Sequence, residues 1–219
     1  MALLALAGLL ACKLKTDPDQ AVAVEVILPD SGRVEITDTY RPRGRALNGF
    51  GDSVAAQLYW SSLDTAFIAV LDSATGVSLA KAVGSGRLQA RVGALPSNPQ
   101  SVTILVKLDL LLADGPDRVT VSLVDSLSSP LQVRALGSPV APAGRRVVYA
   151  ATIFPASGPA VTFVPNDNVL TSATGVASAQ LRLLAGAIPD SVVVTATMRR
   201  PNGTAIPGSP VTFVVEFGP

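Results

Sequence analysis

The chain has 219 residues, of which 48% are hydrophobic and only 15% are charged, and its 17 basic and 16 acidic side chains leave a formal net charge of +1. This length suits one large all-β domain or two small domains, and the hydrophobic content supports packed cores rather than intrinsic disorder. The charge balance excludes the basic surface that a nucleic-acid partner requires, and the absence of histidine excludes Ser-His and Cys-His catalytic pairs.

The first predicted element is an export signal. Residues 2–11 form an uninterrupted apolar run that is too short to cross a bilayer as a helix. The run matches the hydrophobic region of a signal peptide, although no Lys or Arg precedes it. It ends in Leu9-Leu10-Ala11-Cys12, and Cys12 is the only cysteine, so no intramolecular disulfide can form.

This ending resembles the lipobox of bacterial lipoproteins. The resemblance implies a signal peptide over residues 1–11 and lipidation of Cys12, which would become the mature N-terminus. The alternative is an incidental cysteine behind an ordinary signal. Residues 12–20 are polar and predict a tether. The residue after the cysteine is Lys13 and not an aspartate, and in this respect the chain resembles lipoproteins that are sorted to an outer membrane. We therefore expect an exported protein of the cell envelope that is anchored to a membrane.

From residue 21 onward the apolar residues alternate with period two in short segments that turn residues separate, and no long segment has a helical period. The pattern predicts an all-β protein. The expected strands of the first half are 22–28, 34–37, 39–47, 54–60, 67–71, 76–82, 86–92 and 102–107. Those of the second half are 119–124, 131–136, 145–153, 161–164, 176–184, 191–198 and 211–217.

Each half therefore has the size and strand number of an immunoglobulin-like β-sandwich. We predict two tandem sandwiches, over residues 21–108 and 118–219. Asp114-Gly115-Pro116 marks an interdomain joint over residues 109–117, and the leucines of residues 108–112 should be partly buried there. Because almost no residues remain for a spacer, the sandwiches should stack end to end as a short rod.

The first half resembles the bacterial Ig-like domain, group 2, over residues 21–107. Five segments carry this resemblance: Val24-Glu25-Val26-Ile27-Leu28-Pro29, Leu58-Tyr59-Trp60-Ser61-Ser62-Leu63-Asp64, Ile68-Ala69-Val70-Leu71-Asp72, Thr75-Gly76-Val77 and Gly84-Ser85-Gly86-Arg87-Leu88-Gln89-Ala90. Pro42 departs from the pattern, because a proline inside a strand points to a sheet edge or a bulge.

The second half resembles, more loosely, the Ig-like repeats of invasin- and intimin-type adhesins. The segments that carry this resemblance are Pro139-Val140-Ala141-Pro142-Ala143-Gly144, Thr171-Ser172-Ala173-Thr174-Gly175-Val176-Ala177, Val192-Val193-Val194-Thr195-Ala196-Thr197 and Val211-Thr212-Phe213. Proteins of both kinds serve as stalks, adhesins or accessory modules, so the resemblance implies architecture more than activity.

Three short sets of residues are candidate sites of chemistry. Ser78-Leu79-Ala80-Lys81 matches the S-x-x-K string of penicillin-recognising enzymes. On a strand, however, Ser78 and Lys81 point to opposite faces, and the partner motifs S-D-N and K-T-G do not occur. Oxygen ligands for calcium could come from Asn166-Asp167-Asn168 or from the pair Asp114 and Asp117, but each set is small, and turn formation is the favoured role.

Two further features have alternative interpretations. Arg41, Arg43 and Arg45 would form a basic stripe on one strand face, which could meet anionic lipid headgroups or glycans; the favoured interpretation is a solvated face. Trp60, the only tryptophan, could be a sugar-stacking platform, but we predict that it is a core residue.

The sequence thus predicts no catalytic residue, no metal site and no cofactor, and we expect the protein not to be an enzyme. The leading hypothesis is a noncatalytic, lipid-anchored surface protein that acts as a structural or adhesin-like binding module for a surface protein or glycan. The alternative is a self-associating subunit of an extracellular fibre or coat, which the low charge and neutral Ser/Thr/Ala-rich faces favour.

Overall fold

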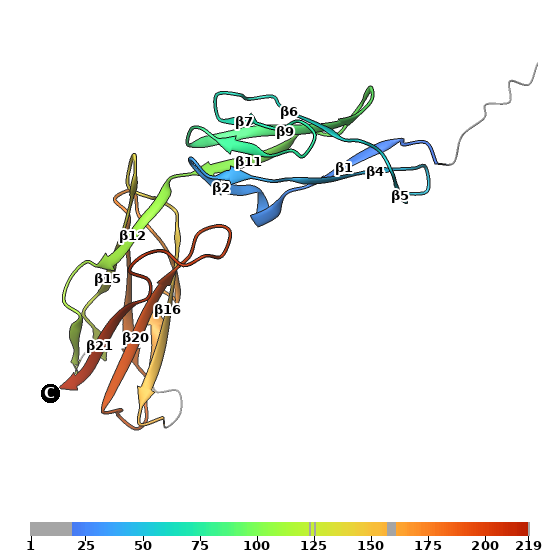
Figure 1. The fold of residues 1–219 in the computed structure, drawn as a ribbon. Coiled ribbons are helices and arrows are strands. Elements are labelled where there is room, and N and C mark those ends of the chain that lie inside the picture. Colours follow the sequence, from blue (N-terminus) through green and yellow to red (C-terminus); the bar gives the residue numbers. More distant parts are fainter. Residues whose placement is uncertain (1–18, 123, 125, 157–160, 219) are drawn as a thin grey trace, which may run out of the picture.

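The structure is a computed structural model that describes residues 19–122, 124, 126–156 and 161–218. Within these residues every regular element is a β-strand except the 3-10 turn η1 (Pro29–Gly32). No helix in the described part of the chain is long and apolar enough to span a membrane. The strands form two sandwiches, and no sheet of the described residues combines strands from both (Figure 1). The prediction of an all-β protein is confirmed.

One layer of the first sandwich is built around a strand that Pro42 divides in two. Its strands are β1 (Ala23–Ile27), β3 (Thr39–Tyr40), β4 (Arg43–Leu47), β5 (Ser53–Val54), β7 (Ile68–Val70) and β8 (Ser78–Ala80). β3 pairs with β8, and β8 with β7, whereas β4 pairs with β1 and β5. The single strand expected over residues 39–47 is therefore interrupted at Pro42, which lacks the N–H that a ladder needs.

The other layer of the first sandwich is a sheet of five strands: β2 (Arg33–Glu35), β6 (Tyr59–Ser62), β9 (Gly84–Val92), β10 (Leu95–Pro96) and β11 (Gln100–Leu105). β9 pairs antiparallel with β6, β10 and β11, and β2 runs parallel to β11. The two layers bury one core cluster around Ile68, Leu88 and Val102 and a smaller one around Trp60.

The second sandwich also has two layers. One contains β12 (Lys107–Ala113), β15 (Leu131–Ser138), β17 (Val161–Val164) and β19 (Val176–Leu183). The other contains β13 (Arg118–Ser122), β14 (Leu127–Ser128), β16 (Arg146–Phe154), β18 (Asn168–Leu170), β20 (Ser191–Met198) and β21 (Val211–Gly218). Tyr149, Leu131, Leu181 and Phe213 are buried in the core between them.

Both sandwiches have the same topology, which is that of an immunoglobulin domain. The first strand is split: its first half pairs antiparallel with the second strand of the fold, as β1 does with β4 and β12 with β15. Its second half runs parallel to the last strand, as β2 does with β11 and β13 with β21. In the lettering of immunoglobulin domains, β1, β4, β8 and β7 of the first sandwich correspond to strands A, B, E and D of one layer. β6, β9 and β11 correspond to strands C, F and G of the other. Two tandem immunoglobulin-like sandwiches are present, as predicted.

The position expected for the joint is wrong. β11 ends at Leu105 and β12 begins at Lys107, so Val106 is the only residue between the two sandwiches. Residues 109–113 belong to β12, and Asp114-Gly115-Pro116 lies between the two halves of the split first strand. Leu108 and Leu111 are buried in the second core, because a register shift between Leu108 and Leu110 turns both inward. The turn at Asp114-Gly115-Pro116 therefore follows a strand within the second sandwich and does not separate two domains.

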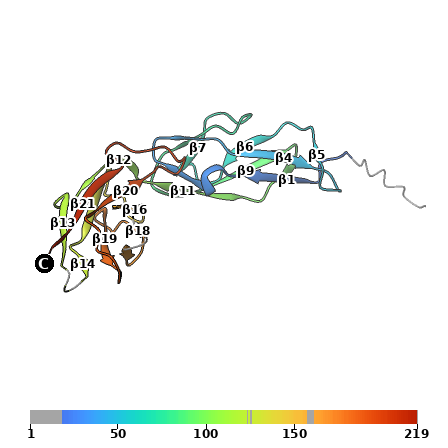
Figure 2. The same ribbon diagram turned by 90° about the horizontal axis from the view of Figure 1, so that it is seen from below.

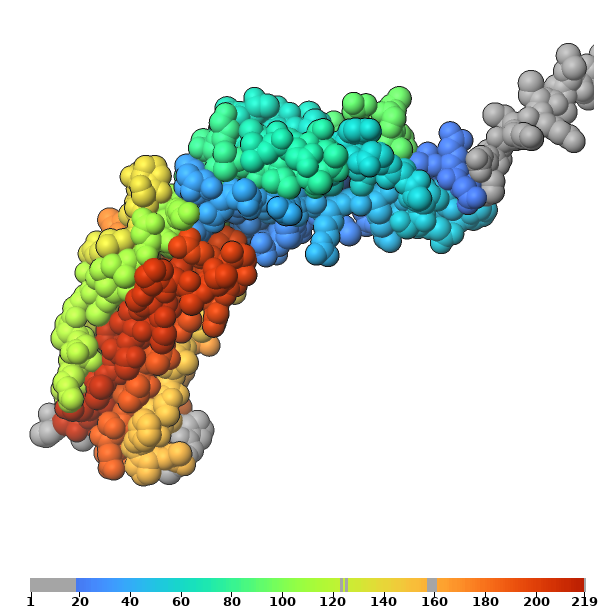
Figure 3. Space-filling view, in the orientation of Figure 1, coloured from blue at the N-terminus to red at the C-terminus, as the bar shows by residue number. Residues whose placement is uncertain are grey.

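The molecule is an elbow and not the expected rod. Figure 1 shows the long axes of the two sandwiches meeting at a marked angle, and the space-filling view in Figure 3 shows contact along one side of the joint. The view from below in Figure 2 places β5 at the end of the first sandwich farthest from the second. The bend arises from the contacts at the joint.

Trp60 is 5% exposed and packs against Val24 and Ala90, which confirms it as a core residue. Gly76 lies so close that a Cβ there would be 2.9 Å from the indole ring.

We predict that Trp60→Ala lowers the free energy of unfolding of the first sandwich by about 3 to 5 kcal/mol, the usual loss for a large aromatic core residue. Urea denaturation measures the loss. Blue-shifted fluorescence that iodide quenches poorly should mark Trp60 in the native chain, and a solvent-like emission maximum would contradict its burial.

Candidate functional site

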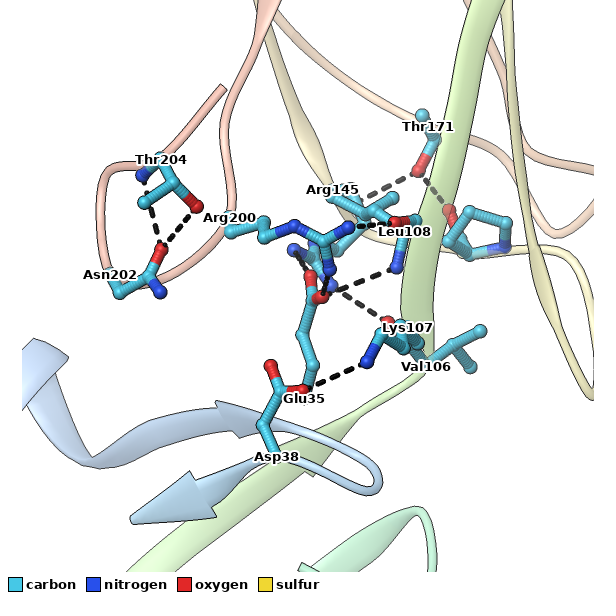
Figure 4. Close-up of polar contacts among 11 residues, drawn as sticks. Glu35, Asp38, Val106, Lys107, Leu108, Arg145, Thr171, Arg200, Asn202 and Thr204 are labelled. Atoms are coloured by element: carbon cyan, nitrogen blue, oxygen red, sulfur yellow. Dashed lines mark hydrogen bonds and ion pairs between the residues drawn. The ribbon is translucent and has the colours of Figure 1, made fainter. Parts of the chain in front are cut away.

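The joint between the sandwiches contains a buried carboxylate. Val34 of β2 faces the core of the first sandwich, so strand alternation turns Glu35 outward, toward the second sandwich. The Glu35 side chain is 0% exposed. A buried carboxylate is stable only with hydrogen-bonding or charged partners, which the second sandwich supplies (Figure 4).

Two arginines and a backbone amide bind this carboxylate. Arg145, directly before β16, donates from Nη2 to Glu35 Oε1 over 2.6 Å. Arg200, in the loop between β20 and β21, donates from Nη1 to Glu35 Oε2. The backbone N–H of Leu108 in β12 also donates to Oε2, over 3.3 Å. Three separate segments of the second sandwich therefore meet at one residue of the first.

The same arginines also bind the backbone that connects the sandwiches. Arg145 Nη1 donates to the carbonyl oxygen of Val106 over 3.0 Å, and Arg200 Nη2 donates to that of Leu108 over 2.7 Å. Val106 is the single connecting residue, and its carbonyl oxygen is bound by Arg145, one of the two arginines that bind Glu35. We refer to Glu35, Arg145 and Arg200 as the joint cluster.

Neighbouring segments hold both arginines in place. The backbone N–H of Arg145 donates to Thr171 Oγ1 over 2.9 Å, and Thr171 Oγ1 donates to the carbonyl oxygen of Pro142 over 2.5 Å. Arg200 lies in a short hairpin, in which its backbone N–H donates to the carbonyl oxygen of Thr204 over 2.9 Å. The arginines are thus positioned before they meet Glu35.

The hairpin also explains the bend. Arg200, Pro201 and Asn202 line one side of a small hollow whose other side includes Asp38 and Tyr40 of the first sandwich. The loop between β20 and β21 therefore occupies one side of the joint. Because the contact is one-sided, the sandwiches meet at an angle.

The electrostatics of the joint cluster favour an intact assembly. One carboxylate lies between two guanidinium groups, and burial lowers the pKa of Arg145 while Glu35 opposes that shift. Every buried side-chain nitrogen and oxygen in the described residues has a hydrogen-bond partner. Removing Glu35 would leave the buried Arg145 guanidinium group without its carboxylate, and an uncompensated buried charge of this kind costs about 3 to 5 kcal/mol.

An outer ion pair supports the joint more weakly. Lys107 Nζ lies 2.9 Å from Asp38 Oδ1, and the two side chains are 37% and 35% exposed. Exposed pairs of this kind contribute about 0 to 1 kcal/mol because water and salt screen them. The joint cluster is therefore the stronger of the two sets of ionic contacts between the sandwiches.

The structure does not bring the S-x-x-K residues together. Ser78 is buried in β8, and its hydroxyl donates to the carbonyl oxygen of Gly76 over 2.9 Å. Lys81 follows the strand, is exposed, and donates from Nζ to the carbonyl oxygen of Thr65 over 3.2 Å. Ser78, Leu79 and Ala80 lie on a strand, as expected for this motif, whereas Lys81 directly follows the strand.

The other predicted candidates have structural partners or lie outside the described residues. Asp114 forms an ion pair with Arg134 at 2.8 Å, and the Asn166 side chain accepts the backbone N–H of Asn168 over 2.9 Å, as in an Asx turn. In the arginine stripe, Arg45 pairs with Glu25 across β1 and β4 at 2.5 Å. Arg41 and Arg43 are exposed. Cys12 lies outside the described residues.

Sequence reasoning missed all three members of the joint cluster. One signal was present: Glu35 stands between Val34 and Ile36 in a predicted strand, and it is one of only three glutamates in the chain. Its partners lie 110 and 165 residues away. No local pattern reports contacts over such separations.

Comparisons with known proteins add little to this picture. No family model matches the chain, and no curated protein matches its sequence. Among solved structures, the adhesin InvE of Yersinia pseudotuberculosis is 14% identical with a TM-score of 0.43, over 90% of this chain and 59% of that one. The fibronectin(III)-like modules of Clostridium thermocellum CbhA are 11% identical with a TM-score of 0.43, over 89% and 93%. Domains 4 and 5 of the S-layer protein SbsC are 12% identical with a TM-score of 0.34, over 91% and 100%.

These likenesses are too weak to support an argument about function. The chain spans 59% of the length of the adhesin structure. The immunoglobulin-like fold itself rests on the pairing of the strands described above.

The hairpin that carries Arg200 depends on Gly208. The Leu111 backbone N–H donates to the carbonyl oxygen of Pro207 over 3.0 Å, and a Cβ at Gly208 would overlap the Leu111 carbonyl oxygen. Gly203, in the same loop, has a similar positive φ of 80° but nothing within 4 Å of its Cβ position.

We predict that Gly203→Ala lowers the free energy of unfolding of the second sandwich by about 1 to 2 kcal/mol, because a residue with a Cβ is strained in a left-handed conformation. Gly208→Ala should lower this free energy clearly more than Gly203→Ala does, as measured by urea denaturation. Equal losses in the two variants would contradict the close packing of Gly208 against Leu111.

We predict that Glu35→Gln loosens the joint, because the buried Arg145 and the partly buried Arg200 then lose their counter-charge. Spin labels at Asn98→Cys and Thr120→Cys, in a Cys12→Ser chain, report the distance between the sandwiches by pulsed electron resonance. The distance distribution should be narrow in the native chain and broad in the variant.

The matched control is Glu25→Gln, which removes the same charge from the first sandwich. The Glu25 carboxylate pairs with Arg45 at the surface, where the two side chains are 40% and 50% exposed. This control should leave the distribution narrow. A distribution that stays equally narrow in Glu35→Gln would show that the cluster does not set the angle.

Proposed function

We propose that the protein is a noncatalytic surface module in which two immunoglobulin-like sandwiches form a stiff, bent arm on a lipid anchor at Cys12. The observation that carries this proposal is the joint cluster, since a single connecting residue and a buried, saturated ion group hold the sandwiches in one orientation. A stalk or presenting arm needs such stiffness. An arm of freely moving domains would not need a buried charge at its joint.

The proposal also assigns each sandwich to a domain family and the arm to a location and a kind of partner. The motifs quoted above support a group 2 bacterial Ig-like domain for the first sandwich and an invasin- or intimin-type repeat for the second. In this role the arm presents a binding surface for a surface protein or glycan at the cell envelope, on an outer membrane or the cell surface. The separation of Ser78 from Lys81, each bound to a different backbone carbonyl, supports a role without catalysis.

The anchor is tested by replacing its cysteine. Because Cys12 would carry the lipid, Cys12→Ala should leave the protein soluble or as an uncleaved precursor, whereas Thr16→Ala in the tether should fractionate with membranes like the native chain. Intact-mass spectrometry of the native protein should find an acylated chain that begins at Cys12. A mature chain that begins elsewhere without acyl mass would refute the anchor and leave the fold unaffected.

The alternative, a self-associating subunit of a fibre or coat, predicts a different behaviour in solution. A presenting arm should remain monomeric when its concentration rises, whereas a coat subunit should assemble. Light scattering over a concentration series, followed by electron microscopy, separates the two roles. Ordered assemblies would contradict the role of a presenting arm and would support the role of a coat subunit.

A further inference from the structure

The loop between β4 and β5 displays a phenylalanine to the solvent. Phe50 is 80% exposed. The loop is nevertheless well ordered by hydrogen bonds: Asn48 is buried, and its Oδ1 accepts the backbone N–H groups of Phe50 over 3.0 Å and of Asp52 over 2.9 Å. Gly51, with a φ of 86°, completes the turn. These bonds therefore fix the backbone that presents the phenyl ring to the solvent.

This loop lies at the end of the first sandwich where the chain enters it. The backbone N–H of Val22 donates to the carbonyl oxygen of Leu47 over 2.8 Å, directly before the loop. Figures 1 and 2 show the start of the described chain and β5 together at this end, with the second sandwich at the opposite end. The seven peptide units from Cys12 to Asp19 span about 25 Å at most. A lipid on Cys12 would therefore hold this end close to the membrane.

Apolar side chains accompany Phe50 at this end of the first sandwich. Val22 is 54% exposed beside the loop. A shallow hollow at the same end is lined mainly by small apolar side chains, among them Ala21, Val54, Ala94 and Leu95. Scattered exposed apolar residues are ordinary, but an ordered loop that displays an aromatic ring at the tethered end of a domain is a specific arrangement.

We propose that Phe50 inserts into the interfacial region of the membrane that carries the lipid on Cys12. The inference rests on the proposed anchor and adds a second contact to it. An anchor alone leaves the domain free to pivot, whereas an anchor together with a fixed aromatic contact sets its tilt. Because the joint cluster fixes the elbow, the same contact also sets the direction in which the second sandwich points.

The charges at this end define the kind of contact. Asp19 and Asp52 are the ionisable side chains of the entry segment and the Phe50 loop in the described residues, so no basic cluster is present there to attract anionic lipid. The proposed contact is apolar. It should therefore persist at high salt, unlike the binding of a polybasic patch.

The test uses the full lipidated protein, reconstituted in vesicles of phosphatidylethanolamine and phosphatidylglycerol. Trp60→Phe removes the native fluorescence, and Phe50→Trp then places a reporter in the loop. Val124→Trp is the matched control, because Val124 is 88% exposed in a loop of the second sandwich. The Phe50→Trp emission should shift to the blue, and brominated acyl chains should quench it several-fold more than they quench Val124→Trp. If Trp60→Phe does not fold, the same comparison is made as difference spectra with Trp60 retained.

The outcomes separate this inference from the anchor on which it rests. If the protein carries acyl mass and floats with the vesicles but Phe50→Trp behaves like Val124→Trp, the anchor stands and the inference is wrong. If acyl mass and flotation are both absent, the anchor has failed and the inference falls with it. A blue shift that depends on protein concentration and occurs without vesicles would assign the loop to contact with a second copy and overturn the membrane contact.

Discussion

The Glu35 carboxylate lies between Arg145 and Arg200, and the relation of the two sandwiches depends on this contact. Burying charges costs solvation free energy, and even a well-paired group of this kind often adds little net stability. Its effect is on specificity, because an arrangement that kept these side chains buried but separated them would leave a buried charge without its partner. The joint cluster therefore selects one angle among those that a single connecting residue permits.

The cluster also couples segments that are remote in sequence. It joins the end of β2, the start of β12, the segment before β16 and the hairpin between β20 and β21. The second sandwich supplies both arginines from its loops, which is where immunoglobulin-like folds vary without disturbing their cores. The one-sided position of the hairpin then converts a tandem repeat of one topology into an elbow.

The bend between the sandwiches means that the proposed membrane contact of the first sandwich would also orient the second sandwich. β5, which follows the Phe50 loop, and β2, which carries Glu35 at its end, lie at opposite ends of the first sandwich in Figure 1, and two core clusters lie within that sandwich. An arm that is fixed at both ends of its first domain presents the second domain in one direction. In this proposal, stiffness at the joint and orientation at the membrane depend on separate residues.

The sequence by itself determined the β class, the approximate strands, the burial of Trp60 and the two-sandwich architecture, because alternation and turn residues are local signals that each strand carries. It placed the joint at residues 109–117, since a leucine cluster before Asp114-Gly115-Pro116 looks the same whether it ends a domain or fills its first strand. Only the pairing of β12 with β15 distinguishes these cases. The tertiary structure alone decided the elbow, because Glu35 meets partners 110 and 165 residues away and their convergence exists only after both sandwiches have folded.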